Sequence, residues 1–114
     1  MGAKVENYPE IIQTILTRYE EILNQKATSG RETELVCDTN HDHYMLNTVG
    51  WNGKERIWHT IVYVRLREGK IWIEVDNLED GIASDLVEAG VPKNDIVLAF
   101  HHPSLRPLTE FASS

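Results

Sequence analysis

Cysteine, long apolar runs and positive charge are all scarce in this sequence. Its one cysteine, Cys37, cannot form an internal disulfide or build a structural zinc site alone, which disfavours an oxidising compartment. The longest uninterrupted apolar run is the five residues Ile96 to Phe100, whereas a membrane-spanning helix needs about 20. No apolar stretch of an export signal follows the first basic residue. We therefore expect a soluble, cytoplasmic protein whose fold depends on packing.

The rest of the composition is that of an ordinary globular domain. The chain has 114 residues, of which 41% are apolar and 25% are charged, and this lies outside the disordered and low-complexity classes. A domain of this size buries only about two thirds of the surface that its unfolded chain exposes. Because no repeat, linker or biased segment is visible, we expect a single domain over residues 1–114.

The charge is negative and unevenly distributed. Eighteen acidic residues accompany eleven basic ones, giving a net charge of −7, which disfavours direct binding to a phosphate backbone. Residues 74–95 hold seven acids and one base, whereas residues 54–70 hold five bases and two acids. Such charge runs occur on many solvent-exposed surfaces that bind nothing. The alternative interpretation is that the acidic stretch forms a surface that binds a basic partner. The candidate partner-binding residues are Glu74, Asp76, Glu79, Asp80, Asp85 and Glu88.

The first expected element is an amphipathic helix that begins near Tyr8. Pro9 suits its first turn, where the missing N–H of proline costs nothing. Apolar residues then recur every three or four positions, which places them in one continuous stripe on a helix. The stripe consists of Tyr8, Ile11, Ile12, Ile15, Leu16, Tyr19, Ile22 and Leu23. This helix should pack one face against the remainder of the chain.

The middle of the chain predicts an antiparallel four-stranded β-meander. Asn52-Gly53 and Glu68-Gly69 are two-residue turn signals between runs rich in β-branched and aromatic residues. The expected strands cover residues 34–38, 43–51, 56–67 and 70–75. The alternation around the first turn is irregular, which a bulge or burial of both faces would explain.

The second turn sets a definite register for its two strands. On one face all the paired residues are apolar, and a slip by one residue would move all of them to the other face. These pairs are Leu66 with Ile71, Val64 with Ile73 and Val62 with Val75. The reverse face pairs Tyr63 with Glu74 and Arg65 with Trp72, and the second of these pairs predicts a guanidinium stacked on an indole.

A short second helix is expected over Gly81–Ala89, with Asp80 as its N-cap. Gly90 should end it in a left-handed conformation, followed by Val91, an apolar residue that can fold back on the helix. Residues 96–100 predict a short strand, and residues 101–114 predict an arm laid over the surface or a mobile end. The chain is thus assigned to the α+β class: long N-terminal helix, four-stranded antiparallel meander, short second helix, short C-terminal strand and extended tail.

Histidines are the main candidates for chemistry, but their spacing does not match known ligand patterns. His41 and His43 flank an aspartate and His101 and His102 are adjacent, and Cys37 could join them only if the tail folded back. Cys37 itself falls in the middle of an expected strand, where a thiol behaves as a small buried hydrophobe. The sequence predicts no catalytic residue, no metal site and no cofactor, and hence a protein that is not an enzyme.

Three tryptophans, Trp51, Trp58 and Trp72, fall within the expected sheet. Packing roles account for most tryptophans in such positions. Trp72 nevertheless lies on the face opposite the apolar pairs, together with Ile61 and Tyr63, so the sheet is expected to be apolar on both sides. One side can take the helices, and the other needs the tail or another subunit as a cover. We expect a homo-oligomer whose interface includes Tyr63, Arg65 and Trp72.

The order and spacing of several short motifs resemble the XisI family, whose members are described as controlling factors for excision of the fdxN element in cyanobacteria. The first group of matching residues is Asp38, Thr39, Asp42, His43, Tyr44, Gly50, Trp51 and residues 69–73. The second group is residues 81–83, Leu86, Val87, residues 90–93, residues 95–98, Phe100, His101 and Pro103. The sequence departs from the family pattern at Trp58, His59 and Ala99.

The resemblance implies a role beside a site-specific recombinase and a companion protein, XisH, whose own sequence resembles a nuclease-type fold. It implies no catalytic or binding residue. Two hypotheses follow. In the first, the chain is a non-enzymatic regulator that binds an XisH-like protein through its acidic stretch and neutralises it as an antidote would. In the alternative, it is a DNA-binding recombination accessory factor that lays the basic stretch Lys54–Lys70 on the duplex.

Overall fold

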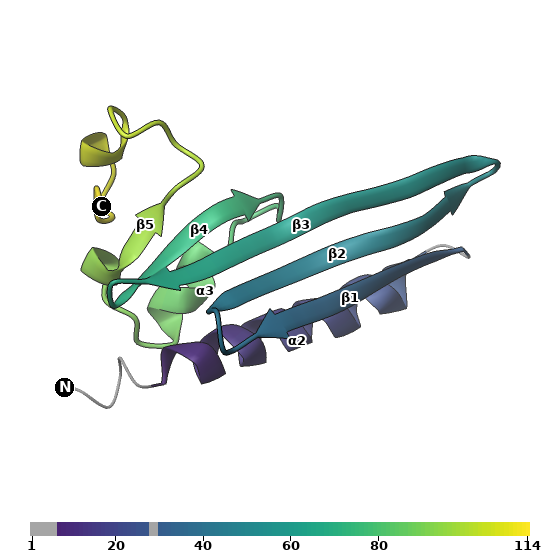
Figure 1. Cartoon of the computed structure of the whole chain (residues 1–114), viewed down its shortest axis with the longest axis horizontal. Coiled ribbons are helices and arrows are strands. Elements are labelled where there is room, and N and C mark those ends of the chain that lie inside the picture. The colour runs from purple at the N-terminus through teal and green to yellow at the C-terminus, as the bar shows by residue number, and fades with distance from the viewer. Residues whose placement is uncertain (1–6, 28–29) are drawn as a thin grey trace.

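The computed structural model describes residues 7–27 and 30–114, which form one long helix beneath a twisted sheet (Figure 1). The helix, α2, covers Tyr8–Lys26. The strands are β1 (Arg31–Asp38), β2 (His43–Asn52), β3 (Glu55–Arg67), β4 (Lys70–Asp76) and β5 (Ile96–Leu98). Between β4 and β5 lie α3 (Ala83–Glu88) and the 3₁₀ turn η1 (Lys93–Asp95), and a second 3₁₀ turn, η2 (Arg106–Leu108), follows β5. No helix among these described residues has both the length and the apolar content to cross a membrane.

The sheet has five strands in the order β1-β2-β3-β4-β5. The first four form the expected antiparallel meander. The fifth lies parallel to β4, so the sheet is mixed. The hairpin of β2 and β3 is much longer than the other strands and projects beyond the body of the molecule (Figure 1).

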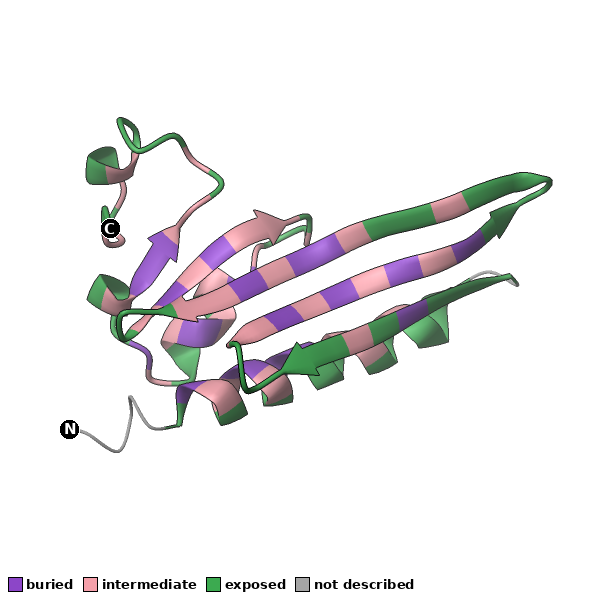
Figure 2. Ribbon diagram, viewed as in Figure 1, coloured by how far each residue is buried: buried purple, intermediate pink, exposed green. Residues whose placement is uncertain are grey.

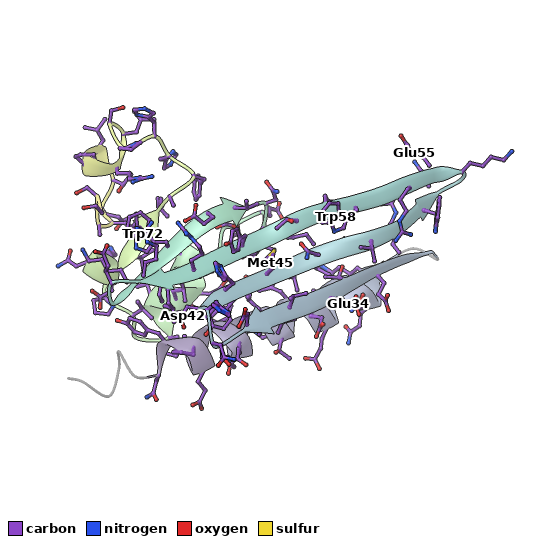
Figure 3. All side chains as sticks on the ribbon, in the orientation of Figure 1. Glu34, Asp42, Met45, Glu55, Trp58 and Trp72 are labelled. Carbon is purple, nitrogen blue, oxygen red and sulfur yellow. The ribbon has the colours of Figure 1, made fainter. Side chains whose placement is uncertain are left out.

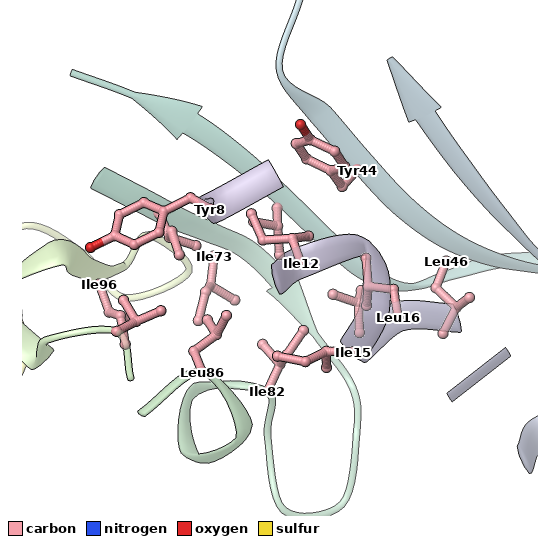
Figure 4. Close-up of a cluster of buried hydrophobic side chains, with 14 of the residues drawn as sticks. Tyr8, Ile12, Ile15, Leu16, Tyr44, Leu46, Ile73, Ile82, Leu86 and Ile96 are labelled. Atoms are coloured by element: carbon pink, nitrogen blue, oxygen red, sulfur yellow. The ribbon is translucent and has the colours of Figure 1, made fainter. Parts of the chain in front are cut away.

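α2 packs its apolar stripe against one face of the sheet, which we call the inner face. Along β2 every second residue is buried beneath the helix, as the alternating colours in Figure 2 show. The fully buried side chains come from α2, from the inner face and from α3 (Figure 4). They include Tyr8, Ile12, Leu16, Tyr44, Leu46, Val62, Val64, Ile71, Ile73, Ile82, Leu86 and Ile96. This single cluster confirms the predicted role of the helix.

The register of β3 and β4 confirms part of the prediction. Near the turn, Leu66 pairs with Ile71, Val64 with Ile73 and Arg65 with Trp72, as expected. A bulge then shifts the register, so that Tyr63 pairs with Val75 and Val62 with Asp76. The expected pairs of Val62 with Val75 and of Tyr63 with Glu74 are therefore wrong. The reason is that Glu74 is the extra residue of the bulge, and bulges depend on packing that a turn signal does not encode.

A second bulge lies between β2 and β3, where the irregular alternation predicts one. Leu46 pairs with Val62 and Asn47 pairs with Thr60, so that Ile61 is the extra residue. As a consequence Ile61 and Val62 are both buried, although they are consecutive in the strand. The expectation that Ile61 shares the outer side with Tyr63 is therefore wrong.

The second helix is shorter than expected and has a different cap. α3 begins after Ile82, and the Asp80 side chain makes no capping hydrogen bond. The N–H of Ile82 instead donates to the carboxylate of Asp76, six residues earlier, at 2.8 Å. Burial raises the pKa of this Asp76 carboxyl, while the N–H donors partly offset the shift. At the other end Gly90 has a positive φ of 103°, which confirms the predicted glycine cap.

The tail is an ordered arm over one end of the sheet, which decides between the two expected alternatives. The backbone N–H of Ala112 donates to the carbonyl of Ile96, and Phe111 packs against the core. The guanidinium of Arg106 donates to the carbonyls of Ala99 and His101 at 3.2 and 3.0 Å. The arm thus covers β5 and the adjoining end of β4.

Tyr44 carries a polar atom that the core does not satisfy. Its hydroxyl is buried and has no hydrogen-bond partner among the residues that the structure describes. Removing an unsatisfied hydroxyl costs nothing, so Tyr44→Phe should leave the free energy of unfolding unchanged or raise it by about 1 kcal/mol. The matched control is Tyr8→Phe, which removes a hydroxyl that donates to Asp95 and should cost about 1.5–3 kcal/mol. Urea unfolding measures both, and equal losses would contradict the prediction.

Candidate protein-binding surfaces

The free edge of β1 is blocked by side chains of α2. The side-chain amide of Asn24 donates to the carbonyl of Thr33 at 2.9 Å and accepts from the N–H of Thr33 at 2.8 Å. The carboxylate of Glu20 accepts the N–H of Leu35 at 2.8 Å. Backbone groups that an incoming strand would use are therefore occupied, which opposes strand addition at this edge.

The opposite edge, β5, is covered by the tail. Ala112 forms an isolated parallel bridge with Val97, and its N–H donates a hydrogen bond to the carbonyl of Ile96 at 2.9 Å. Both edges of the sheet are thus occupied by the chain itself. A partner would have to dock on a face, on a groove or on the projecting hairpin.

The side of the sheet turned away from α2 is here called the outer face (Figure 3). On β1, β2 and β3 it is formed by the residues that alternate with the buried ones, given the register of the strands. These residues are Glu32, Glu34, Val36, Asp38, His43, Met45, Asn47, Val49, Trp51, Arg56, Trp58, Thr60, Tyr63, Arg65 and Arg67. Figure 3 labels one such residue on each of these strands: Glu34 on β1, Met45 on β2 and Trp58 on β3.

Large apolar side chains lie uncovered on this outer face. Trp58 is 70% exposed, Trp51 52% and Val36 47%. Trp58 pairs across the hairpin with Val49, and the guanidinium of Arg56 lies 5.0 Å from the ring centre of Trp51. Exposed tryptophans beside arginine are typical of the centre of a protein interface.

The predicted oligomer-interface residues lie on the outer side, but only two of them belong to this uncovered region. Tyr63 hydrogen-bonds the ring of His43 at 2.8 Å, and Arg65 forms an ion pair with Glu74 at 2.8 Å. Trp72 is partly buried beneath Arg67 and Arg106, whose guanidinium carbons lie 5.0 and 5.7 Å from its ring centre. The expected stack of Arg65 on Trp72 is therefore wrong, because the guanidinium of Arg65 forms an ion pair with Glu74 instead.

The predicted acidic partner-binding residues are not gathered into one patch. Three of them have partners within the chain: Glu74 pairs with Arg65, Asp76 accepts the N–H of Ile82, and Asp85 accepts the hydroxyl of Tyr19 at 2.5 Å. Burial and this carboxylate together raise the pKa of Tyr19 to about 12. The other three, Glu79, Asp80 and Glu88, are exposed.

Two of the acidic residues do meet in a groove between α2 and α3. The groove encloses about 560 Å³. Three carboxylates, those of Glu10, Asp85 and Glu88, contribute to its walls, together with one cation, Arg18. Its remaining lining residues are Asn7, Ile11, Thr14, Ile15 and Ala89. The groove combines negative charge with a small apolar floor, and the contribution of α2 to it was not predicted from the sequence.

The cysteine and the histidines are dispersed among local contacts. Cys37 is largely exposed, contrary to expectation, because β1 lies at the edge of the sheet and has β2 as its one neighbouring strand. Partial burial raises the pKa of its thiol, which reduces the thiolate fraction. His41 bonds the carboxylate of Asp38 at 2.8 Å, which lowers the pKa of that carboxyl. His102 bonds Ser104 in the tail at 2.9 Å. Across residues 7–27 and 30–114, no three His, Cys, Asp or Glu side chains are placed to hold a metal ion.

Comparison with known families accounts for this architecture. The family model described as XisI protein matches residues 2–113. The chain belongs to the XisI family. Two solved XisI structures from Anabaena variabilis ATCC 29413 are similar to it over nearly their whole length. A XisI-like protein has a TM-score of 0.89 at 31% identity, covering 96% of this chain and 99% of that one.

The second structure is the fdxN element excision controlling factor XisI, with a TM-score of 0.85 at 40% identity, covering 97% of this chain and 99% of that one. No curated protein matches the chain with comparable significance. The XisI fold, a helix on a five-stranded mixed sheet, thus agrees with the predicted α+β class; the predicted C-terminal strand is β5, and only its parallel pairing with β4 was not predicted.

Proposed function

We propose that this chain is a non-enzymatic controlling factor for site-specific excision of DNA, of the fdxN-element type. One observation carries the proposal: the chain is 40% identical over almost its full length to a protein named as the fdxN element excision controlling factor XisI. Identity at that level over almost the whole chain goes with a shared fold, as the TM-score of 0.85 shows. The role of that protein is therefore the best available guide to this one.

The proposed mode of action is binding to an XisH-like protein of nuclease-type fold, and neutralising it. A nuclease presents basic side chains to DNA, and a protein that offers carboxylates to the same surface competes with DNA for them. The net charge of −7 supports this mode. The groove lined by Glu10, Asp85 and Glu88 supplies a surface where such carboxylates meet.

Charge reversal in the groove tests this mode. We expect Glu10→Lys combined with Glu88→Lys to weaken binding to the co-expressed XisH-like protein about tenfold or more, because each change replaces an attraction with a repulsion. Isothermal titration of the two purified proteins measures the change. The control is Glu55→Lys, an exposed glutamate at the hairpin tip (Figure 3), at the opposite end of the molecule from α3 and the start of α2 (Figure 1). This change should leave the affinity within about twofold. Equal effects at both places would contradict the groove as the binding site.

The alternative of a DNA-binding accessory factor has weaker support from the geometry. Of the five bases in Lys54–Lys70, Arg65 is paired with Glu74 and the ammonium group of Lys70 donates to the backbone oxygen of Ser114. Two others, Arg56 and Arg67, lie over tryptophan rings. Arg56 and Arg67 keep their charge in these contacts, so DNA binding is disfavoured mainly by the net charge of −7, which opposes approach to phosphates.

The uncovered outer face supports a further part of the proposal, that the chain works as a homo-oligomer. Exposed apolar side chains of this size, rimmed by charge, are characteristic of protein interfaces. A light-scattering mass at micromolar concentration tests this part separately from binding to the XisH-like protein, and a monomer would contradict it.

A further inference from the structure

We propose that two copies of the chain pack outer face to outer face, across β1, β2 and β3, about a two-fold axis that runs along β2. The inference rests on the proposed homo-oligomer and goes beyond it by assigning the surface, the symmetry and the residue pairs. It does not depend on the role in DNA excision.

The charges on the outer face are segregated by strand. On β1 every charged outer residue is acidic: Glu32, Glu34 and Asp38. On β3 every charged outer residue is basic: Arg56, Arg65 and Arg67. The strand between them, β2, presents neither carboxylates nor guanidinium or ammonium groups on this face. Its outer residues are His43, Met45, Asn47, Val49 and Trp51. The face is therefore negative along β1, without charge along β2 and positive along β3, where Arg65 is itself paired with Glu74 of β4.

With the strands of the two sheets aligned, two symmetric face-to-face arrangements exist, and the charge pattern is self-complementary in only one of them. A two-fold axis along β2 exchanges the two outer strands, so the acidic strand of each copy faces the basic strand of the other. An in-plane axis perpendicular to the strands places each strand over its own copy, which sets acid against acid and base against base. Opposed like charges are destabilising. Charge alone therefore selects the axis along β2.

The register of the three strands then gives the contacts. Val36, Met45 and Tyr63 lie in one row across the strands, so Val36 of each copy faces Tyr63 of the other, with the two Met45 side chains meeting at the axis. In the neighbouring row, Asp38 of each copy faces Arg65 of the other. These contacts form an apolar centre with charged pairs on both sides, as in known interfaces.

The tip of the hairpin adds a second pair of charges. Glu32 and Trp58 occupy the ends of one row, and Arg56 lies one row further toward the tip. Glu32 of each copy therefore approaches Trp58 and Arg56 of the other. This contact would cover the indole of Trp58, which is 70% exposed in the single chain.

The occupied sheet edges favour this face over the usual route to β-sheet dimers. The side chains of Asn24 and Glu20 hydrogen-bond the backbone of β1, and Ala112 of the tail pairs with Val97 of β5. A continuous sheet across two copies would require breaking these bonds. The outer face instead offers its apolar residues without any rearrangement of the fold.

Charge exchange between Glu32 and Arg56 tests the proposed geometry. Both side chains are exposed, so the variants should fold, which circular dichroism checks. By sedimentation equilibrium, Glu32→Arg and Arg56→Glu should each weaken the dimer about tenfold or more, and the double variant should restore the dissociation constant to within about threefold of the parent. Glu21→Arg, an equal change of charge on the exposed side of α2, should have no effect.

Each other outcome overturns a defined part of the inference. A dimer that both single changes leave intact would place the interface elsewhere and keep the homo-oligomer. Weakening by the single changes without recovery in the double variant would reject the axis along β2. A parent chain that stays monomeric at 100 µM or so would remove both the interface and the homo-oligomer, and would leave binding to the XisH-like protein to its own titration.

Discussion

Leu16→Ala is expected to lower the free energy of unfolding by about 2–5 kcal/mol, the largest loss of any single change proposed for this chain. Leu16 is fully buried at the middle of α2, where it points toward the inner face and lies near Leu46 (Figure 4). Truncation removes its contacts and leaves a cavity that a helix fixed at both ends cannot close. The neighbouring Thr17 is exposed on the same helix. Thr17→Ala should therefore change stability by no more than about 0.5 kcal/mol. Urea unfolding of both variants measures the difference, and a loss below about 1 kcal/mol for Leu16→Ala would contradict the role of the helix.

Gly50→Ala is also expected to lower the free energy of unfolding strongly, by about 1–3 kcal/mol or more. A Cβ at this position would lie 2.2 Å from the carbonyl oxygen of Gly30 and 2.8 Å from the Cα of Arg31. Both are backbone atoms, so neither can move without displacing the start of β1. The same carbonyl accepts the N–H of Trp51, and the displacement would therefore extend to the outer face.

The control for Gly50→Ala separates crowding from turn strain. Gly53 lies in the hairpin turn with a φ of +65° and has nothing within 4 Å of its Cβ position. Gly53→Ala thus carries only the cost of a left-handed backbone, about 1–2 kcal/mol. Thermal and urea unfolding of the two variants should rank Gly50→Ala as the more destabilised. The reverse ranking would show that β1 can yield at this point.

Sequence periodicity predicts the elements of this fold because each depends on residues close together in the chain. The stripe of α2 repeats every three or four residues, the Glu68-Gly69 turn sets the first pairs of β3 and β4, and Gly90 ends α3. Each of these features is decided within about one turn of helix or one hairpin.

The features that the sequence does not predict depend on distant neighbours. The bulge at Glu74 is marked by no local pattern, and the irregular alternation that indicates a bulge between β2 and β3 does not identify Ile61 as its extra residue. Asp76 caps α3 in place of Asp80 because the chain folds back over six residues. The parallel pairing of β5 likewise depends on the path of the chain through α3.

The sequence indicates which residue types form the candidate surfaces, but it does not indicate correctly which individual residues are exposed there. The aromatic and arginine content of the sheet indicates an interface, but Trp72 is partly covered by the tail, and Trp51 and Trp58 are the exposed tryptophans. The Asn52-Gly53 signal misplaces the turn by one residue: it would pair Trp51 with Lys54 and Val49 with Arg56. The structure turns at Gly53-Lys54 and pairs Trp51 with Arg56 and Val49 with Trp58. The predicted acidic residues do not form one patch, because several of their carboxylates accept hydrogen bonds from groups distant in sequence, as Asp85 does from the hydroxyl of Tyr19.

These surfaces fit the proposed role of a regulator that acts through protein contacts. The apolar outer face with segregated charge is suited to a second copy, and the acidic groove between α2 and α3 is suited to a basic partner. Their positions on different sides of the sheet allow both to be occupied at once. A dimer would then present two grooves, which raises the apparent affinity for a partner that is itself dimeric.

The most direct test of this account is to measure, side by side, how the purified chain binds its XisH-like protein and a random DNA duplex. The measurement is made at about 50 and 200 mM salt, because binding to phosphates is lost steeply over that range. The account predicts binding to the protein that weakens as salt rises, and no binding to the duplex at either concentration. Salt-sensitive binding to the duplex, with none to the XisH-like protein, would contradict it.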